Sequence, residues 1–338
     1  MSLKAGGLPD KWLERREFNR PKGEFGYVYP PGSPEFDDWV LYEKDPERHV
    51  AYITLNRAEK MNAIPTYAWL KLADLVREAE LDDDVKVIIF RGKGTCFGTG
   101  VDANELLFIW GWGTAKGDTE DAKYKPSLRE RMYPIRDVIT GPRSFDQTVL
   151  RCTKATICQV HSYCYGAHFQ IAMCSDIVVA TEDALFTHPV FRYIGGIGDF
   201  PLMFEIFGLK KAKEIVLTGR PITAEEAYQF GLVTRVVPYD KLEETVLDFA
   251  QAISVLTLDG IMVTKSLMET SLEARGLGVG SALGWIGDGW ITNLKLARGE
   301  WSFVKDRRDK GVKDAVHHRD SLSSDNFSMR RDVIKKKK

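Results

Sequence analysis

Two histidines in the middle of the chain, His168 and His188, could move protons near neutral pH, and Asp199 could support one of them. The ordinary pKa of histidine lies near neutrality, and a carboxylate beside the ring fixes its tautomer and stabilises the imidazolium. His188 with Asp199 is therefore a candidate general base, and His168 is the second candidate. A structural role is the competing interpretation for each of them, since Asp199 could instead cap a helix beginning near Pro201.

The sequence lacks the patterns of several other chemistries. Ser162 does not lie in a G-x-S-x-G elbow, no two histidines have H-E-x-x-H spacing, and no P-loop is present. The five cysteines include no C-x-x-C pair and lie among apolar or small residues. We therefore expect buried and reduced thiols, no metal site and a cytoplasmic protein.

The overall composition is that of an ordinary globular protein. Of 338 residues, 44% are hydrophobic and 28% are charged. A formal net charge of −1 provides no global field for nucleic acid or an anionic membrane. No apolar run reaches the ~20 residues of a transmembrane helix, and the first residues lack the apolar core of a signal peptide. We expect one large α/β domain with extensions, and neither nucleic acid nor a membrane as partner.

The candidate catalytic side chains must be positioned by apolar strands that alternate with helices. The expected strands are 39–42, 49–55, 85–90, 155–160 and 177–180, and the expected helices are 65–79, 169–175 and much of 203–310. A polar turn joins the first two strands as a pair. The strand–helix–strand order argues for a layered α/β fold with crossover connections.

Changes in composition divide the chain into four parts. An extended arm over 1–37 is followed by the core over 38–245, a helical C-terminal region over 246–320 and a polar, solvated basic tail over 321–338. The core contains an insertion at 106–147, in which two tryptophans, Trp110 and Trp112, precede a charged run. Two interpretations of this insertion stay open: a solvated loop, or a lid that shields both tryptophans from water.

Four stretches, taken in order and spacing, resemble the crotonase (enoyl-CoA hydratase/isomerase) superfamily. Residues 53–63 read ITLNRAEKMNA, like the family's L-N-R-P-x-x-x-N-A, and residues 94–102 read GTCFGTGVD, like its F-x-x-G-x-D. Residues 163–176, YCYGAHFQIAMCSD, and residues 216–238, which begin VLTG and end VVP, resemble two further family stretches. The resemblance covers roughly residues 38–310.

The resemblance implies a fold and an assembly. The fold would be the crotonase α/β spiral of ββα units, with a helical C-terminal region that mediates trimerisation. The partners would be further copies of the chain, in a homotrimer or a homohexamer. Asp102 matches a family aspartate that is usually structural, so we expect no catalytic role for it.

The resemblance also implies how a carbonyl would be activated. Family members hold an enolate-like oxyanion with two backbone N–H groups, which by position are those of Val101 and Ala167 here. Gly100 would allow the tight turn before the first donor, and Gly166 with Ala167 would begin a helix whose free N–H groups favour an anion. Ala167 stands where the family usually has glycine, so its methyl group leaves less room for a substrate to approach the N–H group of this residue.

Coenzyme A would enter as part of the substrate, with no tightly bound cofactor. Arg57 and Lys60 are candidates for its phosphates, and a solvated surface is the other interpretation of both. Ala63 and Val101 flank the positions where the family's adenine and pantetheine arm usually lie.

The sequence departs from the family at both catalytic glutamates. These positions fall at Gln170 and near Val190, and neither side chain can transfer a proton as a carboxylate does. We therefore expect a lyase, isomerase or hydrolase acting on an acyl-CoA rather than an ordinary hydratase, with Gln170 able to hold a water. A carbon–carbon bond hydrolase of a cyclic β-diketone, using His188 and Asp199, is the first alternative. A non-catalytic acyl-CoA-binding protein is the second.

Overall fold

The structure is a computed structural model, and it describes residues 38–103, 132, 135–136, 140–193, 200–290 and 296–329. Several predictions lie outside the described residues: the arm over 1–37, most of the insertion at 106–147 with Trp110 and Trp112, and Asp199. Residues 330–338 of the predicted tail also lie outside them.

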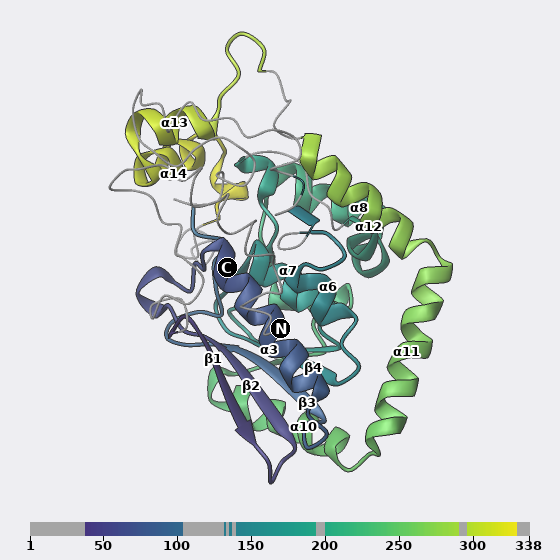
Figure 1. The fold of residues 1–338 in the computed structure, drawn as a ribbon. Coiled ribbons are helices and arrows are strands. Elements are labelled where there is room, and N and C mark those ends of the chain that lie inside the picture. The colour runs from purple at the N-terminus through teal and green to yellow at the C-terminus, as the bar shows by residue number, and fades with distance from the viewer. Residues whose placement is uncertain are drawn as a thin grey trace.

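A six-stranded sheet forms one layer of the core (Figure 1). In spatial order its strands are β1 (Val40–Asp45), β2 (Val50–Leu55), β3 (Val87–Gly92), β4 (Ala155–Val160), β6 (Ile177–Thr181) and β9 (Arg235–Val237). The first two strands form the predicted antiparallel hairpin, and every later neighbour pair is parallel. Parallel neighbours require crossover connections, which explains the helical segments between these strands.

A smaller sheet of three strands stands beside the first. It consists of β5 (Tyr163–Tyr165), β7 (Leu185–Thr187) and β8 (Ile222–Thr223). The pair β4 and β5 precedes helix α7 (Ala167–Cys174), and the pair β6 and β7 precedes α8 (Phe200–Thr218). Each ββα unit thus supplies one strand to each sheet, which confirms the predicted spiral. An isolated bridge from Gly98 to Cys164 brings the segment after β3 to this sheet.

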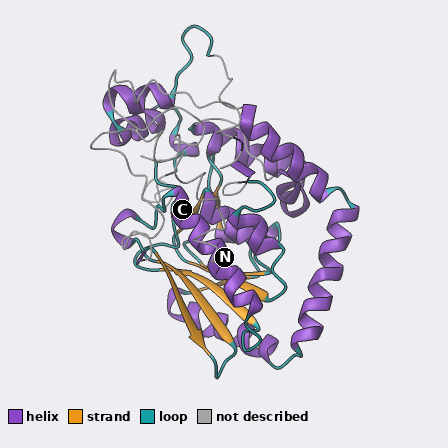
Figure 2. Cartoon of the chain, viewed as in Figure 1, coloured by secondary structure: helices purple, strands orange, loops and turns teal. Residues whose placement is uncertain are grey.

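Helices cover both faces of the large sheet (Figure 2). On one face lie α3 (Thr66–Leu81), α6 (Phe145–Leu150) and α7, and on the other lies α10 (Leu242–Ser254). Along β3, Ile88 and Phe90 pack in the cluster with α3, while Val87 and Ile89 pack in the cluster with α10. A strand buried on both faces is apolar at successive positions, which is why this segment reads as an unbroken apolar run.

The C-terminal part is helical, as predicted. It contains α9 (Ala224–Gln229), α11 (Leu258–Ala274), α12 (Leu277–Trp290), α13 (Phe303–Lys310) and α14 (Val312–Ser321). Helix α11 runs along the edge of the molecule (Figure 1), and its Ile261 packs with residues of the large sheet. No single helix in the described parts has both the length and the apolar composition to cross a membrane, and one bent pair, Tyr239–Ser254 with Leu258–Ala274, has both only when taken together.

The start of the predicted tail differs from the expectation of a solvated end. Met329 is buried, and its carbonyl oxygen accepts a hydrogen bond of 3.0 Å from the Tyr165 hydroxyl. The 3-10 turn η7 (Asp325–Phe327) precedes it. The chain after α14 therefore packs on the smaller sheet as far as Met329.

Candidate functional site

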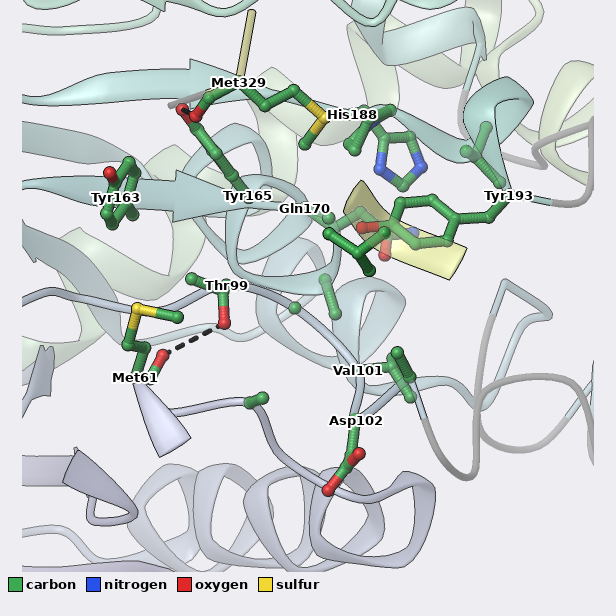
Figure 3. Close-up of a pocket in the computed structure, with 18 of the residues that line it drawn as sticks. Met61, Thr99, Val101, Asp102, Tyr163, Tyr165, Gln170, His188, Tyr193 and Met329 are labelled. Atoms are coloured by element: carbon green, nitrogen blue, oxygen red, sulfur yellow. Dashed lines mark hydrogen bonds between the residues drawn. The ribbon is translucent and has the colours of Figure 1, made fainter. Parts of the chain in front are cut away.

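A cavity of about 430 Å³ lies where the smaller sheet, the start of α7 and the C-terminal helices meet. In Figure 3, Met61, Thr99 and Tyr163 lie at one side of this cavity, and His188 and Tyr193 lie at the other, with Gln170 between them. The wall also includes the predicted donor residues Val101 and Ala167. The structure therefore gathers most of the predicted site residues around one space.

The two glycine turns of the predicted donor site face each other. Gly100 has a φ of +97° and Gly166 has a φ of +59°, conformations that favour glycine. A Cβ atom built on either glycine would lie 3.4 Å from the Cα atom of the other. A Cβ atom on Gly100 would also lie 3.1 Å from the carbonyl oxygen of Tyr165. The absence of side chains therefore lets the segments that begin with Val101 and Ala167 approach closely.

Local pairing orients the N–H groups of these segments. Ile64 donates its N–H to the carbonyl of Gly100 at 3.0 Å and accepts the N–H of Asp102 at 3.1 Å. In such a parallel bridge the N–H of the intervening residue, Val101, points away from Ile64. Ala167 begins α7, where the first N–H groups have no partner within the helix. Both turns thus offer a backbone donor at the cavity wall.

His168 lies behind the first glycine turn and outside the cavity wall. Its Nδ1 atom accepts a hydrogen bond of 2.9 Å from the N–H of Gly100. Burial lowers the pKa of His168 to about 3, so the ring is neutral and carries its proton on Nε2. The rings of Trp69 and Phe97 stand edge-on to it, with centroids at 5.1 Å and 5.3 Å. The prediction that His168 acts as a base is not supported, since the ring is enclosed and its Nδ1 is occupied.

His188 lines the cavity directly after β7. Its side chain is stacked near Phe169, with ring centroids 6.2 Å apart, and the residue is only 7% exposed. Burial lowers the pKa of His188 to about 4. Among the residues that the structure describes, none forms a hydrogen bond with its Nδ1 atom. Its predicted partnership with Asp199 remains a prediction, because Asp199 lies outside the described residues.

The two residues predicted to stand at the family's glutamate positions, Gln170 and Val190, also belong to the cavity wall. Gln170 is buried on α7 and Val190 begins the 3-10 turn η4 (Val190–Arg192). Gln170 and His188 line the same cavity (Figure 3). The loss of the family's glutamates at these two positions stays a prediction, and both predicted positions face the same cavity.

The candidates for coenzyme A binding have different surroundings. Arg57 is buried, and its Nη1 donates to Asp102 and to the carbonyl of Ala63, each at 2.7 Å. A guanidinium so placed stabilises the turn before the cavity, and the prediction that it contacts a phosphate is not supported. Asp102 has the structural role expected of it. Lys60 is exposed at the cavity rim, where Ala63 also lies, so both remain candidates.

Sequence reasoning missed the residues that α14 and its neighbours add to the cavity. They include Tyr193, Arg319 and Asp320. The guanidinium of Arg319 lies 4.7 Å from the centre of the Tyr193 ring. Arg319 belongs to a charged segment that reads as solvated surface, so no local signal identifies it as a wall of a cavity.

Comparison with known proteins identifies relatives across most of the chain. The model of the enoyl-CoA hydratase/isomerase family matches residues 45–279. A Mycobacterium tuberculosis protein that carries the name enoyl-CoA hydratase EchA13 is 30% identical over 277 residues, or 79% of this chain and 83% of that protein. The mevalonyl-coenzyme A hydratase sidH of Aspergillus fumigatus is 29% identical over 269 residues, or 78% of this chain and 91% of its own length.

Solved structures show the same similarity. The crystal structure of an enoyl-CoA hydratase/isomerase from Xanthobacter autotrophicus Py2 superposes with a TM-score of 0.69 at 29% identity, covering 85% of this chain and 98% of that one. An enoyl-CoA hydratase from Mycobacterium smegmatis gives a TM-score of 0.70 at 25% identity, covering 87% and 98% of the two chains.

Proposed function

Since this chain belongs to the enoyl-CoA hydratase/isomerase family, known also as the crotonase superfamily, we propose that it binds an acyl-CoA thioester and stabilises an enolate-like oxyanion. The observation that carries this proposal is the close approach of the Gly100 and Gly166 turns at the cavity wall. The thioester oxygen would accept hydrogen bonds from the N–H groups of Val101 and Ala167. Two preorganised donors in a water-poor site stabilise the charge that develops on this oxygen.

The CoA portion would lie at the side of the cavity formed by Lys60, Met61 and Ala63. Lys60 is exposed there and could reach a phosphate, whereas Arg57 is held by Asp102. The acyl group would then extend past the donor turns toward His188 and Tyr193. The enzyme needs no tightly bound cofactor for such chemistry, because the thioester itself provides the acidic α-carbon.

Proton transfer would differ from that of a two-glutamate hydratase. The resemblance puts an amide, Gln170, and a valyl group, Val190, at the two family positions, and neither can exchange a proton as a carboxylate does. We assign this step to His188, which lines the acyl side of the cavity and is neutral at neutral pH. A negative charge developing nearby favours the protonated imidazole, so the pKa of His188 rises as the reaction needs a base. Asp199 is the proposed support of the imidazolium.

This arrangement favours a lyase, isomerase or hydrolase over an ordinary hydratase. A carbon–carbon bond hydrolase of a cyclic β-diketone is the second candidate, favoured by the same replacement of both glutamates and by the buried His188. Its oxyanion would be held by the same two donors. A protein that binds acyl-CoA without turnover is the remaining alternative, and any measurable turnover eliminates it.

The assembly is proposed to be a homotrimer or a homohexamer. Helix α11 buries only Ile261, and it exposes Leu267 and Met268, each at 65%. The next helix, α12, exposes Val279 and Leu283. An apolar surface of this kind usually marks an interface, and a second copy of the chain is the partner that the family resemblance implies.

Ligand-induced stabilisation tests the proposed function. Binding at a hundred times Kd adds about 2.7 kcal/mol to the free energy of unfolding, so coenzyme A or acetyl-CoA should raise the melting temperature clearly. A panel of branched, cyclic and unsaturated acyl-CoAs, followed by product analysis, would then identify the reaction. Absence of any shift with millimolar CoA ligands, together with cleavage of a cyclic β-diketone, would select the second candidate instead.

A further inference from the structure

The acyl side of the cavity contains a buried guanidinium that the proposed reaction does not use. Arg319, on α14, lines the cavity and its side chain is only 5% exposed. Its Nε and Nη2 atoms both donate to the same oxygen of Asp320, at 2.9 Å and 2.7 Å. Its Nη1 atom is buried and has no hydrogen-bond partner within the described residues. A buried donor left without an acceptor is costly, so an acceptor is expected when the site is occupied.

A second guanidinium makes this region more positive. Arg192, at the end of η4, donates from Nε to the carbonyl of Thr218 at 2.8 Å and from Nη2 to the carbonyl of Phe327 at 2.7 Å. Its own Nη1 is also buried without a partner among the described residues. The pKa of Arg192 is lowered by burial and by the charge of Arg319, with Asp320 acting in the opposite direction.

The charges of the described residues in this region do not balance. Two guanidinium groups, Arg192 and Arg319, lie near a single described carboxylate, that of Asp320, which interacts electrostatically with both. The carbonyl oxygens that accept from Arg192 provide hydrogen bonds but no negative charge. A further anion would neutralise the excess, and a carboxylate matches a guanidinium in both geometry and charge.

The position of Arg319 in the cavity indicates which part of a substrate would supply that anion. Arg319 lies over the ring of Tyr193, and Tyr193 lies across the cavity from Met61 and Thr99 (Figure 3). With CoA at the Lys60 side, the end of the acyl chain remote from the thioester points to Tyr193. The phosphates of CoA would lie at the other side, near Lys60.

We propose that Arg319 binds a carboxylate at the far end of the acyl chain, so that the preferred substrates are CoA monothioesters of dicarboxylic acids. The inference deepens the proposed acyl-CoA function and rests on it. The carboxylate would approach from the cavity, where Arg319 forms part of the wall, and the guanidinium would turn on binding to present Nη1, which is fully buried in this structure. Asp320, which is bonded to the other two nitrogens, would orient the guanidinium for this contact.

Matched pairs of ligands test the inference by isothermal titration calorimetry. Each pair has the same number of acyl carbons and differs in a terminal carboxylate: glutaryl-CoA with pentanoyl-CoA, adipoyl-CoA with hexanoyl-CoA, and pimeloyl-CoA with heptanoyl-CoA. We expect one dicarboxylic member to bind about ten- to a hundredfold more tightly than its partner, equivalent to about 1.4–2.8 kcal/mol. Equal or weaker binding of all three dicarboxylic members would overturn the inference.

Variants connect that preference to Arg319. Arg319→Met should bring the two Kd values of the preferred pair together, and Arg319→Lys should retain part of the ratio because a cation remains. Asp320→Asn removes the competing carboxylate and should maintain or increase the ratio. Arg275→Met, which removes a guanidinium that is 65% exposed at the end of α11 and paired with Glu205 of α8, is the matched control and should leave the ratio as in the wild type.

The outcomes separate this inference from the proposed function. If no member of any pair binds, the acyl-CoA function itself is wrong. If both members of a pair bind but the ratio is near one, the function stands and the role of Arg319 is wrong. A ratio that persists in Arg319→Met, in protein shown to be folded by its melting transition, also contradicts the inference.

Discussion

The Nδ1 atom of His168 accepts the backbone N–H of Gly100 at 2.9 Å, immediately before the donor residue Val101. The contact joins the two donor segments, because His168 directly follows Ala167 on α7. A ring that is neutral near pH 7 keeps Nδ1 available as an acceptor. The relationship gives His168 a positioning role, in which it fixes the turn without touching the substrate.

Replacement of His168 should therefore reduce catalysis without removing a proton-transfer group. Loss of one oxyanion donor typically lowers the rate about 10²–10³-fold, and we expect His168→Leu to approach the lower end of that range in kcat. His168→Asn, whose Oδ1 can accept at nearly the same position as Nδ1, should recover part of the loss. Steady-state kinetics of both variants would check this. If Asn and Leu were equally impaired, the hydrogen bond to Gly100 would not be the reason.

The same two glycines provide a second prediction. Gly100→Ala would place a methyl group 3.1 Å from the carbonyl of Tyr165 and 3.4 Å from Gly166 Cα, so the donor turns must separate. We expect turnover to fall by at least tenfold. Gly231→Ala is the matched control, because Gly231 has a φ of +86° but nothing within 4 Å of an added Cβ. It should cost about 1–2 kcal/mol of stability from backbone strain and leave kcat unchanged. Similar losses of kcat in both variants would contradict the proposed role of the close contact between the Gly100 and Gly166 turns.

Two buried histidines should lower the stability of the protein in mild acid, and their combined effect exceeds the opposite effect of Asp288, whose pKa burial raises to about 7. The folded pKa values of His168 and His188, about 3 and about 4, lie below the ordinary value of 6.5. The unfolded chain therefore binds more protons below pH 6.5, so this stability is fully present above pH 6.5 and is lost as the pH falls toward the folded values. Each histidine should contribute a slope of about 1.4 kcal/mol per pH unit in that window.

Urea unfolding between pH 7 and pH 4.5 measures this slope. His188→Gln should reduce it by about one proton, whereas the exposed His317→Gln serves as the control for loss of a histidine as such. A wild-type slope unchanged by His188→Gln would mean that His188 is not buried in its neutral form.

The exposed surface of α11 leads to a prediction about assembly. If Leu267 and Met268 lie in an interface between copies, Leu267→Glu should shift the protein toward the monomer in light-scattering measurements. Lys265→Glu would be a poor control, because Lys265 is bonded to Asp176. Tyr239→Glu is better suited, since Tyr239 is 67% exposed on the 3-10 turn before α10. An assembly unaffected by Leu267→Glu would place the interface elsewhere.

Local sequence patterns predicted most of the strands and helices of the fold. The apolar run at Val87–Phe90 predicted a strand because both of its faces are buried, and the hairpin of β1 and β2 followed from its polar turn. The strand and hairpin predictions depend on residues that are neighbours in the sequence. The turns at Gly100 and Gly166 were instead identified through the resemblance to the family, and the structure shows why both positions require glycine.

The less accurate predictions concern contacts between distant segments. Arg57 was a candidate phosphate ligand because a basic residue near a motif resembles a surface cation, yet Asp102, 45 positions away, holds it. His168 was a candidate base because histidine titrates near neutral pH, yet its Nδ1 atom accepts the N–H of Gly100, 68 positions away. Arg319 lines the cavity because α14 packs against it, and the sequence around Arg319 does not predict that packing.

The central claim, polarisation of a thioester by Val101 and Ala167, is tested most directly by infrared difference spectroscopy. The ligand would be butyryl-CoA labelled with ¹³C at the carbonyl, which isolates one stretching band. We predict that this band moves to lower frequency when the ligand binds, and that the displacement is smaller in His168→Leu and Gly100→Ala. A bound carbonyl that vibrates at the frequency of free butyryl-CoA would contradict the account.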